Sequence, residues 1–262
     1  MYKKTIFSII NNRQLIWEMS KRDLKGLTKG AFLGVAWAVI NPLIQVATYV
    51  IIVSFIFKAR LSPNAGPLDY AIYVLSGMIP WQILTKSIQS APSLIRSNTE
   101  LVKQIIYPIE TLPLTSLMVS SFGSLVSLII FLSILPFTGH ISISLFLLPI
   151  PIILLILFIL GISWIFSIVG VLIKDLQEVV TVVMGLLVYL SPVVASESMT
   201  GSKAWKLIML NPLAHVVIAF RDIFWGTFHP VSWLVFIIMS LISFLLGGWV
   251  ITKAKLMINE YI

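Results

Sequence analysis

Residues 146–173 read FLLPIPIILLILFILGISWIFSIVGVLI and contain no charged side chain. A bilayer core about 30 Å thick is crossed by roughly 20 helical residues, so this stretch is long and apolar enough to span a membrane. Further apolar runs lie on both sides of it. Together they predict an all-α polytopic membrane protein with six transmembrane helices, at 32–57, 70–92, 112–137, 146–173, 179–196 and 232–252.

The composition indicates a membrane protein and excludes cysteine-based chemistry. Of 262 residues, 58% are hydrophobic and 11% are charged, whereas soluble domains are nearer to half apolar and a quarter charged. The mean hydropathy is +1.02. The chain has no cysteine, which excludes disulfides, a thiol nucleophile and a cysteine-bound metal. The three histidines have no metal-binding spacing, so no metal site is expected.

The positive charges predict the orientation of the chain. A net charge of +8 could indicate nucleic acid binding, but the Lys and Arg residues cluster outside the apolar runs, so no nucleic-acid partner is expected. An even number of spans places both termini on one side. With both termini in the cytoplasm, thirteen of the 18 Lys and Arg residues are cytoplasmic, as the positive-inside rule requires. The first thirty residues lack the pattern of a cleaved signal peptide.

The whole chain, 1–262, is expected to form one membrane domain. Residues 1–30 would be cytoplasmic, 31–197 would hold spans 1 to 5, and 231–262 would hold span 6 and a cytoplasmic tail. Within the first segment, apolar residues recur at helical spacing over 6–27 and charged residues fall mainly on the other face. This pattern predicts an amphipathic helix in the plane of the membrane surface; such a helix can also be a simple anchor.

Residues 198–230 should form a periplasmic loop, yet they are rich in apolar residues. Asn211-Pro212 and Arg221-Asp222 interrupt the apolar stretches, so each piece is too short to cross the bilayer. Apolar backbone of this kind is stable at membrane depth only when protein buries it or a cavity borders it. Two short re-entrant helices are therefore expected. The alternative is one kinked span, which would place the C-terminus outside.

The sequence lacks the motifs of the common catalytic sites. It has no G-x-x-x-x-G-K-[ST] phosphate loop, no H-E-x-x-H, no G-x-S-x-G and no pair of acids within a span. His215 and Asp222 are the candidates for a membrane enzyme of lipid-sugar metabolism, but without a partner motif a structural role is expected for both. Ion-coupled transporters keep ionisable groups at membrane depth, and these spans do not. The chain is therefore expected not to be an enzyme, and to take energy from elsewhere or to be passive.

Aromatic residues recur along the spans and offer flat faces that suit sugar rings. Those predicted to line a channel are Trp37, Tyr49, Trp81, Phe122 and Tyr189. Aromatic belts at the membrane interfaces are an ordinary alternative for any one of them.

The loop after span 2 reads RSNTELVKQIIYPI over 96–109. Asn98 or Thr99 can cap a short helix with Glu100 in its first turn, and Pro108 should end it. A short rigid helix on the cytoplasmic side could transmit motion from a partner.

Several short motifs occur together in one order. They are Arg22-Asp23-Leu24-Lys25, Gly34-x-x-Trp37, Asn41-Pro42, Gly77-x-x-Pro80-Trp81, Lys174-Asp175-Leu176, Ser191-Pro192, Asn211-Pro212-Leu213 and Arg221-Asp222. This order resembles the ABC-2 type permeases of polysaccharide export, which serve O-antigen, capsule and teichoic acid export. The likeness covers nearly the whole chain. In that family the acid after span 4 usually follows an arginine, and here Lys174 keeps the charge without the fork geometry.

The resemblance implies a homodimer of six-span subunits in the cytoplasmic (inner) membrane, docked on two copies of a separate ATPase subunit. ATP and Mg would bind that partner, and no cofactor would bind this chain. It also implies an interfacial gate helix and a channel between the two permeases. The residues expected to couple to the ATPase are Glu100, Lys103, Tyr107, Lys174 and Asp175.

The expected substrate is an undecaprenyl-pyrophosphate-linked polysaccharide, of O-antigen or capsule type. Teichoic acid or drug export by the same architecture is the alternative. Four cations near the entrance to span 1 are expected to receive the pyrophosphate: Lys21, Arg22, Lys25 and Lys29. Arginine binds phosphate oxygens through its fork, and lysine acts as a point charge. The same cations could equally bind anionic membrane lipids.

Overall fold

The computed structural model describes residues 2–27, 36–52, 67–104, 107–138 and 142–261, and within these ranges every regular element is a helix. The all-α prediction is therefore confirmed. The α-helices are α1 (Tyr2–Asn11), α2 (Arg13–Leu27), α3 (Trp37–Ile51), α4 (Pro67–Ser90), α5 (Leu94–Ser97), α6 (Thr99–Gln104), α7 (Leu112–Thr138), α8 (Pro149–Leu172), α9 (Leu176–Leu187), α10 (Glu197–Met209), α11 (Pro212–Trp225) and α12 (Pro230–Tyr261). Short 3-10 helices lie at Ala91–Ser93 (η3), Ile109–Thr111 (η4) and Ile143–Leu147 (η5).

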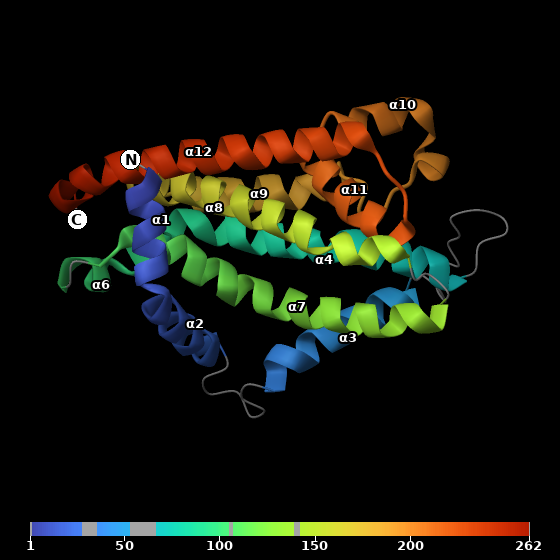
Figure 1. Cartoon of the computed structure of the whole chain (residues 1–262), viewed down its shortest axis with the longest axis horizontal. Helices are drawn as coiled ribbons and strands as arrows, with labels where there is room; N and C mark the ends of the chain where they lie inside the picture. The colour runs from blue at the N-terminus through green and yellow to red at the C-terminus, as the bar shows by residue number, and fades with distance from the viewer. Residues whose placement is uncertain (1, 28–35, 53–66, 105–106, 139–141, 262) are drawn as a thin grey trace.

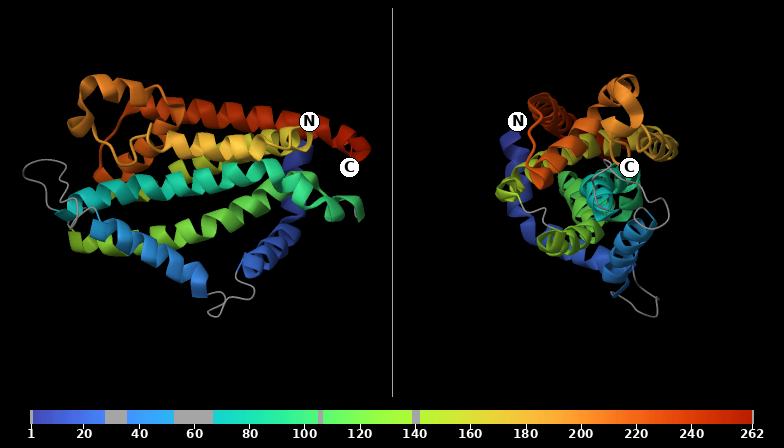
Figure 2. Two further views of the ribbon diagram at one scale, coloured as in Figure 1. Left: turned by 180° about the vertical axis from the view of Figure 1, so that it is seen from behind. Right: turned by 90° about the vertical axis from the view of Figure 1, so that its right-hand side faces the viewer.

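The long helices α4, α7, α8 and α12 run along one axis as an elongated bundle (Figure 1). Both chain termini lie at one end of this bundle, and α10 and α11 lie at the other (Figures 1 and 2). We call these the terminal end and the far end. The shared position of the termini agrees with an even number of crossings.

Among the described residues, three helical segments are long and apolar enough to cross a membrane: Ile109–Thr138, Ile143–Leu172 and Pro230–Lys255. The bent pair of helices before α12 would add a fourth if it were one span. Two further apolar helical stretches, Val39–Thr48 and Leu176–Leu187, are shorter. α4 has 24 residues but is less apolar than these, since it carries Asp69 and Lys86. The structure thus establishes a multi-pass architecture.

The long helices α8 and α12 pack closely against each other. A Cβ atom added to Gly161 would lie 2.2 Å from the backbone of Ser243, and one added to Gly247 would lie 2.2 Å from the carbonyl oxygen of Gly161. The two backbones therefore touch at positions where only glycine fits. The main core surrounds this contact, with the fully buried Trp164, Phe236 and Ile159 among its members.

The N-terminal amphipathic segment folds as two helices instead of the single helix predicted over 6–27. α1 ends at Asn11 and α2 begins at Arg13, and both lie across the bundle at the terminal end (Figure 1). Ile16 and Met19 of α2 are buried, since α2 packs on α7. Phe7, Ile10 and Trp17 expose 64%, 58% and 53% of their surface. These apolar side chains are available to contact lipid or another protein.

Residues 197–225 form two helices joined at a sharp bend. The chain bends by 111° between the helical segments Thr200–Met209 and Pro212–Trp225. Asn211 accepts a hydrogen bond from the backbone N–H of Leu213 at 3.0 Å, and Pro212 occupies the first turn, so the sequence itself starts a new helix there. Gly226 ends α11 with a φ of 64°, a left-handed conformation that favours glycine. The predicted pair of short helices is present.

Candidate functional site

A buried arginine joins three segments at the far end of the bundle. Arg221 of α11 is 8% exposed, and its Nη2 donates to the carbonyl oxygens of Tyr73, at 3.1 Å, and Val193, at 3.3 Å. Its guanidinium carbon lies 3.4 Å from the centre of the Tyr73 ring. Tyr73 in turn donates its hydroxyl to the carbonyl oxygen of Ala195. The cation thus holds α11 against α4 and against the segment after α9.

The neighbouring Asp222 fixes the connection from α11 to α12. Its carboxylate accepts four hydrogen bonds from the next turn of chain: from the Thr227 hydroxyl (2.7 Å), the His229 backbone N–H (2.9 Å), the His229 Nδ1 (2.6 Å) and the Trp233 Nε1 (2.9 Å). The Asp222 side chain is 2% exposed, and burial of a carboxylate requires such donors. His215 of the same helix contacts Ser232 at 3.1 Å. The structural roles predicted for Asp222 and His215 agree with these contacts.

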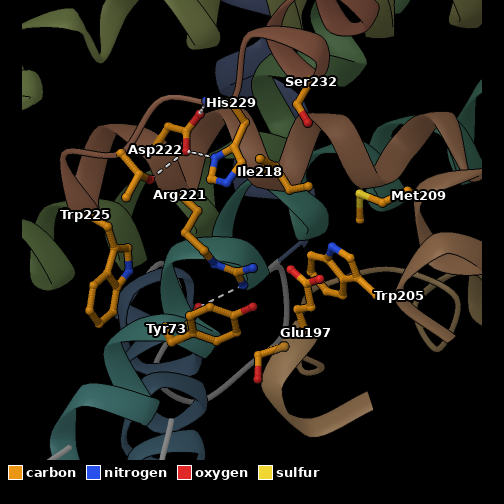
Figure 3. Close-up of a pocket in the computed structure, with 12 residues that line it drawn as sticks. Tyr73, Glu197, Trp205, Met209, Ile218, Arg221, Asp222, Trp225, His229 and Ser232 are labelled. Atoms are coloured by element: carbon orange, nitrogen blue, oxygen red, sulfur yellow. Dashed lines mark hydrogen bonds and ion pairs between the residues drawn. The ribbon is translucent and has the colours of Figure 1, made fainter. Parts of the chain in front are cut away.

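A pocket of about 430 Å³ opens beside this cluster. Its lining combines aromatic side chains, Tyr73, Trp205 and Trp225, with the charged Glu197, Arg221 and Asp222 (Figure 3). Figure 3 shows the guanidinium of Arg221 above Tyr73, with Glu197 and Trp205 on the α10 side of the pocket. Glu197, Thr227 and His229 are exposed, so the pocket reaches the surface.

The cations predicted to receive pyrophosphate lie on α2 at the terminal end, except Lys29, which is outside the described residues. Lys21 contacts Glu18 at 3.0 Å and lies over the Trp17 ring. Arg22 contacts Asp23 at 2.8 Å. Both pairs are exposed, and such pairs contribute little free energy, so a phosphate could replace them. Lys25 is exposed, one turn beyond Lys21 on the same helix.

The aromatic residues predicted to line a channel occupy different environments. Tyr189 is 82% exposed, while Trp37 and Phe122 are half-buried. Trp81 is 4% exposed and belongs to the main core of this chain. Tyr49 is in α3, and its side chain lies outside the described part of the structure. The single chain therefore presents Tyr189, Trp37 and Phe122 at its surface and encloses Trp81.

The helix predicted over the loop after span 2 is present as α6, at the terminal end (Figure 1). Asn98 directly precedes α6, and both residues predicted as caps join it to α5: Asn98 Nδ2 donates to Leu94 O at 2.8 Å, and Thr99 Oγ1 donates to Arg96 O at 2.7 Å. Glu100 is in the first turn, and Lys103 is exposed in the last.

Of the other residues predicted to couple to an ATPase, Tyr107 is 6% exposed and packs with Met19, Ile95 and Leu112. Lys174 and Asp175 are exposed between α8 and α9. Arg96 donates to the Lys174 carbonyl oxygen at 3.0 Å, so α5 and the turn between α8 and α9 are joined. These contacts bring the predicted coupling elements together at one end.

A half-buried ion pair, absent from the sequence predictions, joins two helical segments at the same end. Glu110 is 4% exposed, and both of its carboxylate oxygens accept from Lys255 of α12, at 3.0 and 3.1 Å. Its carbonyl oxygen accepts from the indole of Trp164. The only sequence signal was an acid directly before an apolar run. The cluster around Arg221 had a clearer signal, because an Arg-Asp pair within apolar sequence requires buried partners.

The architecture is that of a polytopic helical membrane protein, with a pair of helices joined at a sharp bend before its last long helix. A family model described as the ABC-2 type transporter matches residues 14–225. The chain belongs to this family.

Relatives cover most of the chain. The O-antigen export system permease protein RfbA of Klebsiella pneumoniae is 27% identical over 215 residues, 80% of each chain. A protein of the same name from Myxococcus xanthus is 24% identical over 221 residues, 81% of each chain. The polysialic acid transport protein KpsM of Escherichia coli is 24% identical over 192 residues, 72% of this chain and 73% of its own.

Proposed function

We propose that this chain is the membrane permease of an ABC exporter that moves a polysaccharide across the cytoplasmic membrane. The observation that carries the proposal is the similarity, over most of the chain, to proteins named for O-antigen export and polysialic acid transport. The first name refers to O-antigen export and the second to polysialic acid transport. Membership of the ABC-2 family supports a transport role in place of catalysis.

The proposed topology has six spans, formed by α3, α4, α7, α8, α9 and α12, with both termini in the cytoplasm. The positions of the termini at one end of the bundle support it (Figure 1). The 111° bend between α10 and α11 favours a re-entrant pair over one kinked span, because the second helix turns back from the direction of the first. With α10 and α11 at the far end, this pair would face the outside.

Two copies of the chain would enclose the channel, and two copies of a separate ATPase would bind ATP and Mg on the cytoplasmic side. The exposed α6 and the turn between α8 and α9 offer adjoining contacts for that ATPase, with Glu100, Lys103, Lys174 and Asp175 accessible or near the surface. Tyr107, being buried, would support these elements from within. The exposed ring of Tyr189 and the half-buried Trp37 and Phe122 would give weak contacts to a sliding glycan, since conduction requires easy release.

The proposed substrate is anchored in the membrane by undecaprenyl pyrophosphate. Its anionic group would lie at the depth of the cytoplasmic headgroups, where Lys21, Arg22 and Lys25 project from α2. The exposed carboxylate partners of Lys21 and Arg22 can be exchanged for phosphate oxygens, which form stronger charge-assisted hydrogen bonds.

Deletion of the gene tests the proposal. The deletion strain should lose its surface polysaccharide and accumulate lipid-linked glycan inside the cell, and the intact gene should restore export. The chain should also co-purify with an ATPase subunit. Normal surface polysaccharide in the deletion strain would refute glycan export. Accumulation of lipid-linked polyol phosphate in place of glycan would instead identify a teichoic acid exporter.

A further inference from the structure

The pocket beside Arg221 has no role in the function proposed above. It lies at the far end of the bundle, between α4, α10, α11 and the start of α12 (Figure 3). Its volume of about 430 Å³ lies within the range of small-molecule sites. Such sites combine apolar and aromatic walls with a few polar groups that orient the ligand, and this pocket has that composition.

The polar group of the pocket is incompletely satisfied. In the described part of the chain, Arg221 donates hydrogen bonds through Nη2, and the buried Nε has no partner. The adjacent carboxylate of Asp222 is already occupied by four donors, which include the ring of His229. A buried cation with free N–H groups favours an oxygen-rich ligand, because each unmet donor keeps the cost of its lost hydration.

The walls of the pocket favour a ring-shaped ligand with apolar faces. Trp205, half-buried on α10, provides an indole at the pocket, while the Tyr73 ring lies under the guanidinium and so holds it in place. A sugar unit has both features, since hydroxyl oxygens surround its edge and C–H groups cover its faces. Glu197 at the mouth could accept hydrogen bonds from further hydroxyls.

We propose that this pocket is a glycan-binding subsite, which holds one sugar unit of the exported polysaccharide between Trp205 and the guanidinium of Arg221. The inference rests on the proposed function, and the proposed topology places the subsite on the outer side of the membrane. There it would hold the glycan after its passage and oppose backward sliding.

Photo-crosslinking in cells tests the subsite with the native glycan. The chain has no cysteine, so Glu197→Cys can carry a benzophenone maleimide at the pocket mouth. Lys203→Cys is the matched control, because Lys203 is exposed on the same helix and does not line the pocket. Illumination, purification of the chain and periodate staining for sugar should reveal a high-mass adduct at position 197 and not at 203. Adding Trp205→Ala or Arg221→Lys should reduce the adduct about tenfold.

The result is read in a deletion strain whose surface polysaccharide is restored by an intact second copy of the gene, and only the labelled copy carries a purification tag. Restored export without an adduct at 197, or with equal adducts at 197 and 203, would overturn the subsite and leave the proposed function intact. An adduct unchanged by Trp205→Ala would also overturn it, and this variant guards against a folding defect in Arg221→Lys. If the intact gene restores no polysaccharide, the proposed function fails and the subsite with it.

Discussion

Arg221 contacts Tyr73 in two ways at once: its guanidinium stacks on the Tyr73 ring at 3.4 Å, and its Nη2 donates to the Tyr73 backbone oxygen at 3.1 Å. A desolvated cation over an aromatic ring is more strongly bound than an exposed one, and a charged donor strengthens the hydrogen bond. The pair therefore fixes the angle between α4 and α11. Gly77, one turn along α4, leaves room for it, since a Cβ there would lie 2.9 Å from Arg221 Nη2.

Replacing Arg221 by leucine should lower the stability of the purified chain. The variant loses two charge-assisted hydrogen bonds and the ring contact, a loss of about 2 kcal/mol or more. Thermal unfolding in detergent, followed by intrinsic fluorescence, measures the effect. Arg22→Leu is the control, because Arg22 is exposed and paired with its exposed neighbour Asp23; equal melting temperatures for the two variants would contradict the interpretation.

Gly161→Ala should disrupt the contact between α8 and α12. The new methyl group would lie 2.2 Å from the backbone of Ser243, so the helices must separate, and overpacking of this kind costs about 1–3 kcal/mol or more. Gly185→Ala in α9 is the control, since a Cβ there has no neighbour within 4 Å. The yield of monodisperse protein after membrane extraction should fall for the first variant only. Equal yields would indicate that the bundle accommodates the methyl group.

The sequence predicted the helices whose boundaries depend on local chemistry. α7 and α8 follow long, mainly apolar runs without a charged residue, and Asn211-Pro212 starts α11 as predicted. The end of α9 depends on distant partners. It was predicted at 196 but lies at Leu187, because Arg221, Tyr70 and Tyr73 donate to the carbonyl oxygens of residues 193–195. Backbone carbonyl groups that accept hydrogen bonds from such side chains do not need the hydrogen bonds of a helix. The donors come from distant parts of the sequence, so the local pattern does not reveal them.

For the functional residues too, sequence spacing predicted local features but not contacts between residues far apart in the chain. Exposed cations on α2 were found from their spacing, since helical neighbours recur every four residues. The ion pair between Glu110 and Lys255 joins residues that are 145 positions apart, and no local pattern links them. The burial of Trp81 also depends on α8 and α11, which pack against α4, so an aromatic pattern alone could not separate core from channel.

Breaking that ion pair on one side should cost more than removing it altogether. Lys255→Met leaves the Glu110 carboxylate buried without its cation, whereas the double variant with Glu110→Gln removes both charges. Loss of one partner from a buried pair is strongly destabilising, and because Lys255 is 46% exposed we expect about 2 kcal/mol at most. Melting temperatures of the two single variants and the double variant form the test. A double variant less stable than Lys255→Met would contradict it.

Charge reversal on α6 should uncouple export from ATP hydrolysis. Glu100→Lys with Lys103→Glu keeps the net charge but inverts the pattern of the short helix at the terminal end. We expect weaker binding of the ATPase and loss of export, measured by co-purification and by surface polysaccharide. Lys203→Glu on α10, an exposed residue at the far end that does not line the pocket, is the control. Full export by the α6 variant would exclude these residues from the coupling contact.

The last prediction separates substrate recognition from membrane anchoring on α2. Arg22→Ala with Lys25→Ala removes two exposed cations and leaves Ile16 and Met19, which pack the helix into the bundle. If the cations bind pyrophosphate, the complex should assemble normally, while export and substrate-stimulated ATPase activity fall about tenfold or more, because each charge-assisted contact contributes about 1.5–3 kcal/mol. If they only bind anionic lipids, at about 1 kcal/mol each, membrane association or assembly should weaken instead.

Arg22→Lys gives a second way to separate the two roles of this helix. Bidentate binding of phosphate requires the guanidinium group, whereas anchoring to lipid requires only the positive charge. A double alanine variant that assembles correctly and exports normally would remove pyrophosphate recognition from α2.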